Sequence, residues 1–240
     1  MNKTPVFLYV IVAVAGASVL ALEILGTRIL GPTFGVSLFL WSALITVTLA
    51  ALSVGYLAGG HWADRDASHR RLSLLPGLAG AWVVAIPWMQ SPVIGMVSGW
   101  ELRASVLAAS VLLFFTPLML LGAVTPYALR LTLSSLERAG RTSGRLFALS
   151  TLASVASALL TGFYLIPHLG VSLLSTLLGS LLLLTAAGGY ATARGGRIDI
   201  PGAALFAVVG LGAPFFSPLE RADPDNGLIA LSQRPYAEIR

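Results

Sequence analysis

The chain has 240 residues, of which 56% are hydrophobic and 10% charged, and its formal net charge at pH 7 is +5. Soluble domains carry about 25% charged residues, so this composition excludes an ordinary soluble domain and predicts an integral membrane protein whose main partner is the lipid bilayer. The absence of cysteine excludes disulfides, thiolate metal sites and cysteine nucleophiles, and the basic residues lie in short loops between apolar runs, which favours a role in topology over a nucleic-acid partner.

Seven segments are long and apolar enough, or nearly so, to form transmembrane helices, since a spanning helix needs about 20 mostly apolar residues. They predict an all-α, polytopic membrane helical bundle within residues 1–219. The third segment is short and contains Pro76 and Pro87, which predicts a kink or a tilt. Residues 90–103 are predicted to form a loop, with a short interfacial helix that carries Trp88 and Trp100. The predicted helices are residues 5–30, 37–62, 72–89, 104–129, 146–169, 171–193 and 200–219.

The first predicted helix contains Glu23 and Arg28, the only charges between Lys3 and Asp64. A carboxylate inside a spanning helix is costly and usually faces a partner or a cavity. Five residues of separation place the two side chains about 140° apart, so they are poor partners for each other. Two interpretations stay open: a buried functional or helix-locking role, or an interfacial pair that extends its charged groups toward the headgroups.

The second predicted helix ends in a glycine-rich stretch followed by charges. Gly55 and Gly59 have the small-xxx-small spacing that lets helices approach closely. Gly60-x-x-x-Asp64-Arg65 and a later Arg-Arg pair resemble the loop motif of major-facilitator transporters between their second and third helices, with two extra residues before the pair. The alternative is a basic cytoplasmic loop with a helix cap.

The fifth predicted helix begins after Arg141 and Arg145, and residues 146–162 are rich in Ser, Thr, Ala and Gly, which predicts a close packing face. His61 and His168 are expected at membrane interfaces. The glycine-rich residues 188–196 follow a hydrophobic helix and not a strand, so they indicate a helix end and not a phosphate-binding loop. No set of His, Asp and Glu has metal-ligand spacing, and we therefore expect no metal site.

Basic residues set the expected orientation, because cytoplasmic loops carry an excess of Lys and Arg. One side holds Lys3, Arg65, Arg70, Arg71, Arg130, Arg138, Arg141, Arg145, Arg194 and Arg197, ten of the fifteen. This predicts a cytoplasmic N-terminus, in the cell (inner) membrane of a prokaryote. Residues 220–240 change character to turn and strand signals, which predicts a β-prone extramembrane tail. Seven crossings would place this tail outside, whereas a re-entrant last segment would place it in the cytoplasm.

Several groups of residues, spread over nearly the whole chain, form a combined pattern. They are Glu23…Arg28-Ile-Leu-Gly31-Pro-Thr-Phe-Gly35-Val-Ser…Trp41, Ser53-Val-Gly-Tyr-Leu-Ala-Gly-Gly60…Ala63-Asp64-Arg65, Thr125-Pro126, Gly140-Arg141…Gly144-Arg145-Leu-Phe-Ala and Gly162-Phe-Tyr-Leu-Ile-Pro167…Gly170. The pattern resembles the membrane half of fused transporter-like/spermidine synthase proteins. The tail from Ser232 to Arg240 looks like the strand that opens the soluble domain of that family.

The resemblance implies a membrane helical module that precedes an aminopropyltransferase-like domain of Rossmann-type methyltransferase fold. The glycine-rich acidic loop and the acidic polyamine pocket of that domain do not occur in these 240 residues. No catalytic or cofactor-binding residue is therefore carried over, and the chain alone is expected to be inactive. The candidate functional or helix-locking residues are Glu23, Arg28, Asp64, Arg65, Arg141 and Arg145.

The leading hypothesis is a membrane module that anchors a synthase domain or a separate synthase chain, and that moves a substrate or product. The first alternative is a small stand-alone transporter of major-facilitator type, which has half the usual number of helices and would need a homodimer. The second alternative is a structural membrane subunit that transports nothing.

Overall fold

The chain folds as a bundle of long helices in a computed structural model that describes residues 6–133, 139–192 and 200–216. The described residues form helices and no strand. The helices are α1 (Val6–Phe34), α2 (Leu38–Arg65), α3 (His69–Val97), α4 (Leu102–Ser110), α5 (Thr116–Thr132), α6 (Ala139–Leu159), α7 (Ile166–His168), α8 (Val171–Thr192) and α9 (Ile200–Gly212), with π-helical stretches η1 (Val111–Phe115) and η3 (Leu160–Leu165) and a 3₁₀ turn η4 (Ala213–Phe216).

Six helices in the described residues are long and apolar enough to cross a membrane, each with 21 to 31 residues. At 1.5 Å per residue even the shortest spans about 30 Å, one hydrocarbon core. They are Val6–Phe34, Leu38–Arg65, His69–Val97, Leu102–Thr132, Ala139–His168 and Val171–Ala191. This is the architecture of a polytopic integral membrane protein. The seventh predicted crossing corresponds to α9, which has only 13 residues, so the count of seven stays a prediction. The β-prone tail lies outside the described residues.

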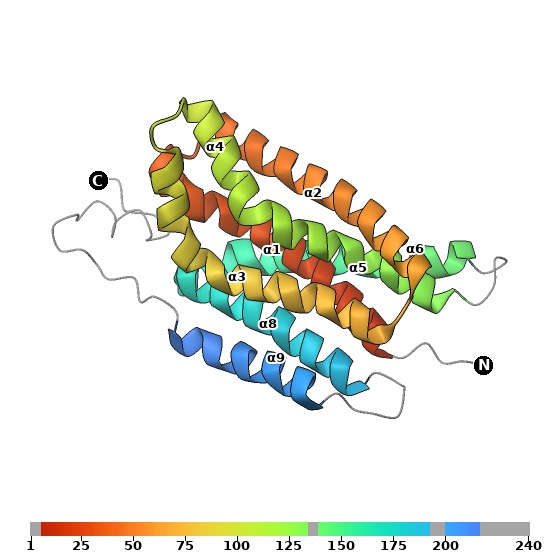
Figure 1. The fold of residues 1–240 in the computed structure, drawn as a ribbon. Coiled ribbons are helices and arrows are strands. Elements are labelled where there is room, and N and C mark those ends of the chain that lie inside the picture. Colours follow the sequence, from red (N-terminus) through yellow and green to blue (C-terminus); the bar gives the residue numbers. More distant parts are fainter. Residues whose placement is uncertain (1–5, 134–138, 193–199, 217–240) are drawn as a thin grey trace.

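The third helix is longer than predicted. The predicted loop over residues 90–103 is wrong for its first half, because α3 continues to Val97 and has 29 residues. Pro87 and Pro92 remove backbone donors without ending the helix, as a packed membrane helix tolerates. Trp88 lies within α3, so no separate interfacial helix carries it. Figure 1 shows the last turns of α3 bending away from its first part, the effect expected of these prolines.

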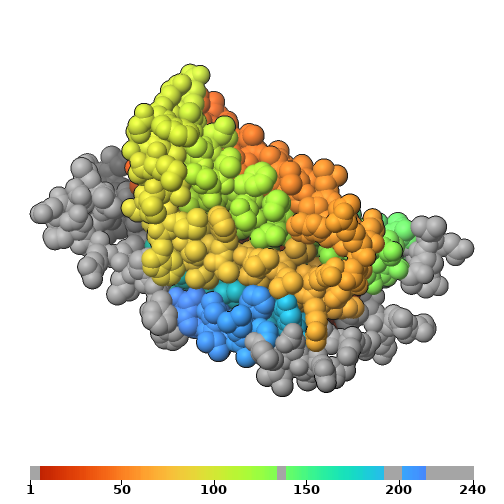
Figure 2. Space-filling model, in the orientation of Figure 1, coloured from red at the N-terminus to blue at the C-terminus, as the bar shows by residue number. Residues whose placement is uncertain are grey.

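α1 occupies the middle of the bundle and packs against α2, α5, α6 and α8 (Figure 1). α2 pairs with α5 and α3 pairs with α8, while α9 lies at the outer edge beside α8. The space-filling view shows α3 crossing one face, with α2 and α4 on one side of it and α9 on the other (Figure 2). The spanning segment Ala139–His168, which includes α6, is the least enclosed of the six, since only 11% of its most apolar stretch is buried.

Glycines set the closest helix contacts. Gly55 and Gly59 lie directly against the backbone of α5, where an added Cβ would collide with the Met119 and Ala123 carbonyls. The prediction that this glycine pair permits close approach is therefore confirmed. The predicted packing face of α6 is confirmed for the side that meets α1, where Ser154 donates a hydrogen bond of 2.7 Å to the Gly16 carbonyl.

Candidate functional site

The most connected polar cluster lies where α2 and α5 end and α3 begins. Asp64 is in the last turn of α2, and its Oδ1 accepts a hydrogen bond of 3.2 Å from Nε of Arg130, near the end of α5. This ion pair joins the ends of two helices that already meet closely through glycines. Both side chains are more than half exposed, so the pair contributes at most about 1 kcal/mol. It links the two helix ends without adding much to stability.

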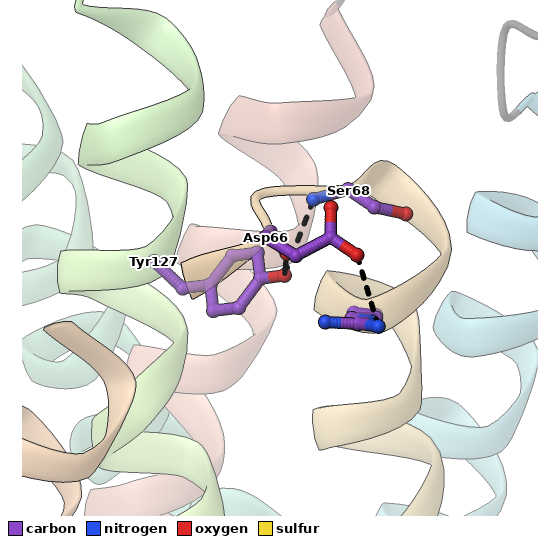
Figure 3. Close-up of polar contacts among 4 residues, drawn as sticks. Asp66, Ser68 and Tyr127 are labelled. Carbon is purple, nitrogen blue, oxygen red and sulfur yellow. Dashed lines mark hydrogen bonds and ion pairs between the residues drawn. The ribbon is translucent and has the colours of Figure 1, made fainter. Parts of the chain in front are cut away.

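Tyr127 holds the short connection between α2 and α3 (Figure 3). Its hydroxyl donates to the Asp66 carbonyl at 2.9 Å and accepts from the Ser68 backbone N–H at 3.2 Å. The ring is only 1% exposed. A fully buried ring whose hydroxyl satisfies two backbone groups of the loop is well suited to keep this loop in one conformation.

Asp66 and Arg71 complete the cluster. Nη2 of Arg71 lies 2.9 Å from Oδ2 of Asp66, so the loop residue is bound to the first turns of α3 (Figure 3). Both side chains are more than half exposed. The cluster therefore combines one buried element, the Tyr127 ring, with two exposed ion pairs. We refer to Asp64, Asp66, Arg71, Tyr127 and Arg130 as the loop cluster.

The predicted site residues Arg65, Arg141 and Arg145 do not join the loop cluster. All three are exposed, and none forms an ion pair with another described residue. Arg141 and Arg145 lie in the first turns of α6, at the same end of the bundle as the loop cluster. Six arginines of the described residues gather at this end, which we call the basic end, namely Arg65, Arg70, Arg71, Arg130, Arg141 and Arg145.

Glu23 and Arg28 are not brought together, as the helical spacing predicts. Among the described residues neither forms an ion pair. Arg28 is exposed near the end of α1 and Glu23 is half-buried. Gly16 of α1 faces α6 and Gly26 faces α2. At 3.6 residues per turn, Glu23 projects between these two directions, toward the gap between α2 and α6.

The sequence pattern did not identify Tyr127 or Asp66 as site residues. Their bonds join positions about sixty residues apart in the chain, and spacing within one segment carries no such information. One weak signal was present: a tyrosine one turn from the end of an apolar helix, beside a basic loop, usually directs its hydroxyl to a polar partner.

The polar groups of the loop cluster are engaged in contacts that hold its conformation. Its carboxylates are paired with arginines, and its tyrosine hydroxyl is committed to the backbone. No three His, Asp or Glu side chains come together as a potential metal site in the part of the chain that the structure describes.

Comparisons of the chain with protein families, with curated proteins and with solved structures gave no significant match.

Proposed function

We propose that the chain is the membrane module of a spermidine-synthase-like system, and that its helices hold an aminopropyltransferase-like domain or separate synthase chain at the membrane. The proposal rests on the positions of the residues that form the family-like pattern. Gly55, Gly59 and Asp64 of α2 meet the segment of α5 that contains Thr125-Pro126. Residues that pack two helices together serve the architecture of the bundle, and a stable bundle is what an anchoring module requires.

The distribution of charge favours anchoring over passage of a polyamine. A polyamine carries several positive charges, and a route across the bilayer would need carboxylates or other anionic partners along it. In the described helices Glu23 is the only acidic residue away from a helix end. We therefore propose that the synthase binds at the basic end, and that the helices hold this end at the membrane surface.

The same proposal places the chain in a prokaryotic cell membrane, with the N-terminus and the basic end in the cytoplasm. Six described arginines lie at the basic end, and Arg28 and Arg103 lie at the opposite end. This asymmetry supports the orientation through the excess of basic residues in cytoplasmic loops. A separate synthase chain bound at the basic end would then meet cytosolic substrates, whereas α9 runs antiparallel to α8 and ends at the opposite end of the bundle (Figure 1).

Co-purification tests the anchoring role. A tagged chain, extracted in mild detergent from the membranes of its own cells, should carry aminopropyl transfer activity with decarboxylated S-adenosylmethionine and putrescine. The 240-residue chain purified from a foreign host should have none. Activity that stays wholly in the soluble fraction, or turnover by the 240-residue chain itself, would contradict the proposal.

The transporter alternative keeps one supporting observation, the transporter-like sequence that ends at Asp64 and Arg65, with Asp64 paired to Arg130. Proteoliposomes that contain only this chain separate the two functions. Saturable uptake of labelled spermidine that is lost in Asp64→Asn would favour the transporter. Uptake no greater than in empty liposomes is the result expected for an anchoring module.

A further inference from the structure

A cavity of about 490 Å³ lies between α1, α6 with η3, and α8. Alanines of α1 and α6 leave this space open, and leucines of η3 and α8 form much of the remaining wall. None of the described residues that line it is charged. Leu160, Leu177 and Leu181 line it and are 38–52% exposed, so the cavity opens sideways to the bilayer. The volume falls in the range of about 300–1,000 Å³ typical of ligand sites.

The cavity extends over about one leaflet of a bilayer. Its α1 wall runs from Ala13 to Leu25, which is about 18 Å at 1.5 Å per residue, and half of a hydrocarbon core is about 15 Å. Leu169, which also lines it, lies between the spanning segments Ala139–His168 and Val171–Ala191, at the end of the bundle opposite the basic end. A connection between two spanning segments lies near the membrane surface. The cavity therefore reaches the headgroup level of the leaflet on that side.

Arg28 places a positive charge at this end of the cavity wall. It follows Leu25, the last α1 residue of the wall, by three residues and Ala17 by eleven. Eleven residues are close to three helical turns, so Arg28 projects within about 20° of Ala17, on the face of α1 that lines the cavity. Arg28 is exposed and forms no ion pair with another described residue. Glu23 is about 140° around the helix from Arg28 and faces away from this wall.

The polarity of the wall matches that of a phospholipid. The wall is aliphatic through the depth of one leaflet, where an acyl chain fits, and has a cation at the membrane surface. A guanidinium binds a phosphate through two parallel hydrogen bonds. A zwitterionic headgroup carries a cation beside its phosphate, which offsets the attraction to Arg28, whereas a headgroup with net negative charge keeps that attraction. The charge of Arg28 therefore selects an anionic lipid.

We propose that the cavity between α1, η3 and α8 holds one acyl chain of an anionic phospholipid, and that Arg28 binds its phosphate in the leaflet opposite the basic end. Entry is lateral, from the bilayer past the exposed leucines, and the second acyl chain stays in the bilayer. A preference for anionic over zwitterionic lipid separates this specific site from filling by bulk lipid. The inference does not rest on the proposed anchoring function, and either can fail alone.

Photolabelling of the chain in phosphatidylcholine vesicles tests the site. The probes are phosphatidylglycerol and phosphatidylcholine that carry the same diazirine midway along one acyl chain. The readout is the label on the lining residues Leu174 and Leu178, located by tandem mass spectrometry. At equal mole fraction the phosphatidylglycerol probe should label them about three- to tenfold more, the preference that one arginine gives at a membrane surface. Equal labelling by the two probes, or loss of the label when glycerol 3-phosphate is added, would overturn the proposal.

Four variants complete the test. Arg28→Gln, a change at an exposed position, should lower labelling by phosphatidylglycerol to the level of phosphatidylcholine and leave the latter unchanged. Arg103→Gln is the matched control, because Arg103 is an exposed arginine of α4 at the same end of the bundle. Ala17→Leu, and independently Ala153→Leu on the facing wall, should abolish the label of both probes by filling the cavity. A preference that survives Arg28→Gln or that Arg103→Gln removes equally, or a label that survives both filling variants, would overturn the site.

Discussion

Trp82 of α3 donates its indole N–H to the backbone carbonyl of Leu113 at 3.0 Å. Leu113 lies in η1, four residues before Pro117, and a proline has no N–H to donate to that carbonyl. In the membrane interior no water supplies the missing bond, so a neighbouring helix must supply it. The side chain of Trp82 thus stabilises the π-helical stretch η1 around Leu113, within the spanning segment Leu102–Thr132, and links it to α3.

Replacing Trp82 tests this bond. Trp82→Phe keeps an aromatic ring and removes the donor, so we expect a loss of about 0.6–2 kcal/mol in the free energy of unfolding in detergent. Trp88→Phe on the same helix is the control, because Trp88 is 45% exposed and should tolerate the change. Equal effects of the two substitutions would show that the indole N–H contributes nothing specific.

The close contact of α2 with α5 allows a direct comparison, because the adjacent glycines Gly59 and Gly60 differ in the space around them. An added Cβ at Gly59 would collide with the backbone at Ala123, whereas one at Gly60 meets nothing within 4 Å. Gly59→Ala should lower the unfolding free energy by about 1–3 kcal/mol through overpacking. Gly60→Ala should leave it within about 1 kcal/mol, with a small gain from helix propensity. The assigned contact would be wrong if Gly59→Ala were the milder change in thermal unfolding.

Tyr127 should control the conformation of the loop between α2 and α3. Tyr127→Phe removes two hydrogen bonds to the backbone, so we expect a loss of about 1–3 kcal/mol. We also expect faster thiol modification of a cysteine placed at Ala67, within this loop. Tyr164→Phe is the control, since Tyr164 is 59% exposed and contacts His168 through its ring. Unchanged thiol reactivity in Tyr127→Phe would mean that the phenol does not restrain the loop.

Glu23 is expected to be more sensitive than Glu101. Glu101 is highly exposed in the connection between α3 and α4, whereas Glu23 lies within a spanning helix and has no ion-pair partner among the described residues. If a partner helix or subunit meets Glu23, then Glu23→Gln should lower the yield of assembled complex, measured by size-exclusion chromatography with light scattering. Equal tolerance of Glu23→Gln and Glu101→Gln would favour the interfacial interpretation.

Apolar length and glycine spacing made much of the fold predictable from sequence, because both are local properties. The close contact at Gly55 and Gly59 follows from such a spacing. The length of α3 was mispredicted because the polar composition of residues 90–103 was taken to indicate a loop, whereas α3 continues to Val97.

Other features depend on residues far apart in the chain and left no local pattern. The hydroxyl of Tyr127 meets a loop about sixty residues away. An apolar cavity between α1, α6, η3 and α8 arises only when these elements are placed together. Among the predicted charged residues, the structure pairs Asp64 and leaves Arg65 exposed, since the partner on α5 is decided by tertiary packing.

The orientation of the basic end is the central claim, because a synthase held there must face cytosolic substrates. The chain has no native cysteine, so Ala67→Cys at the basic end and Gly99→Cys at the opposite end can each be labelled in intact cells with a membrane-impermeant thiol reagent. The account predicts that Gly99→Cys reacts at once and that Ala67→Cys reacts only after the membrane is opened. Reaction of Ala67→Cys in intact cells, with Gly99→Cys protected, would contradict it.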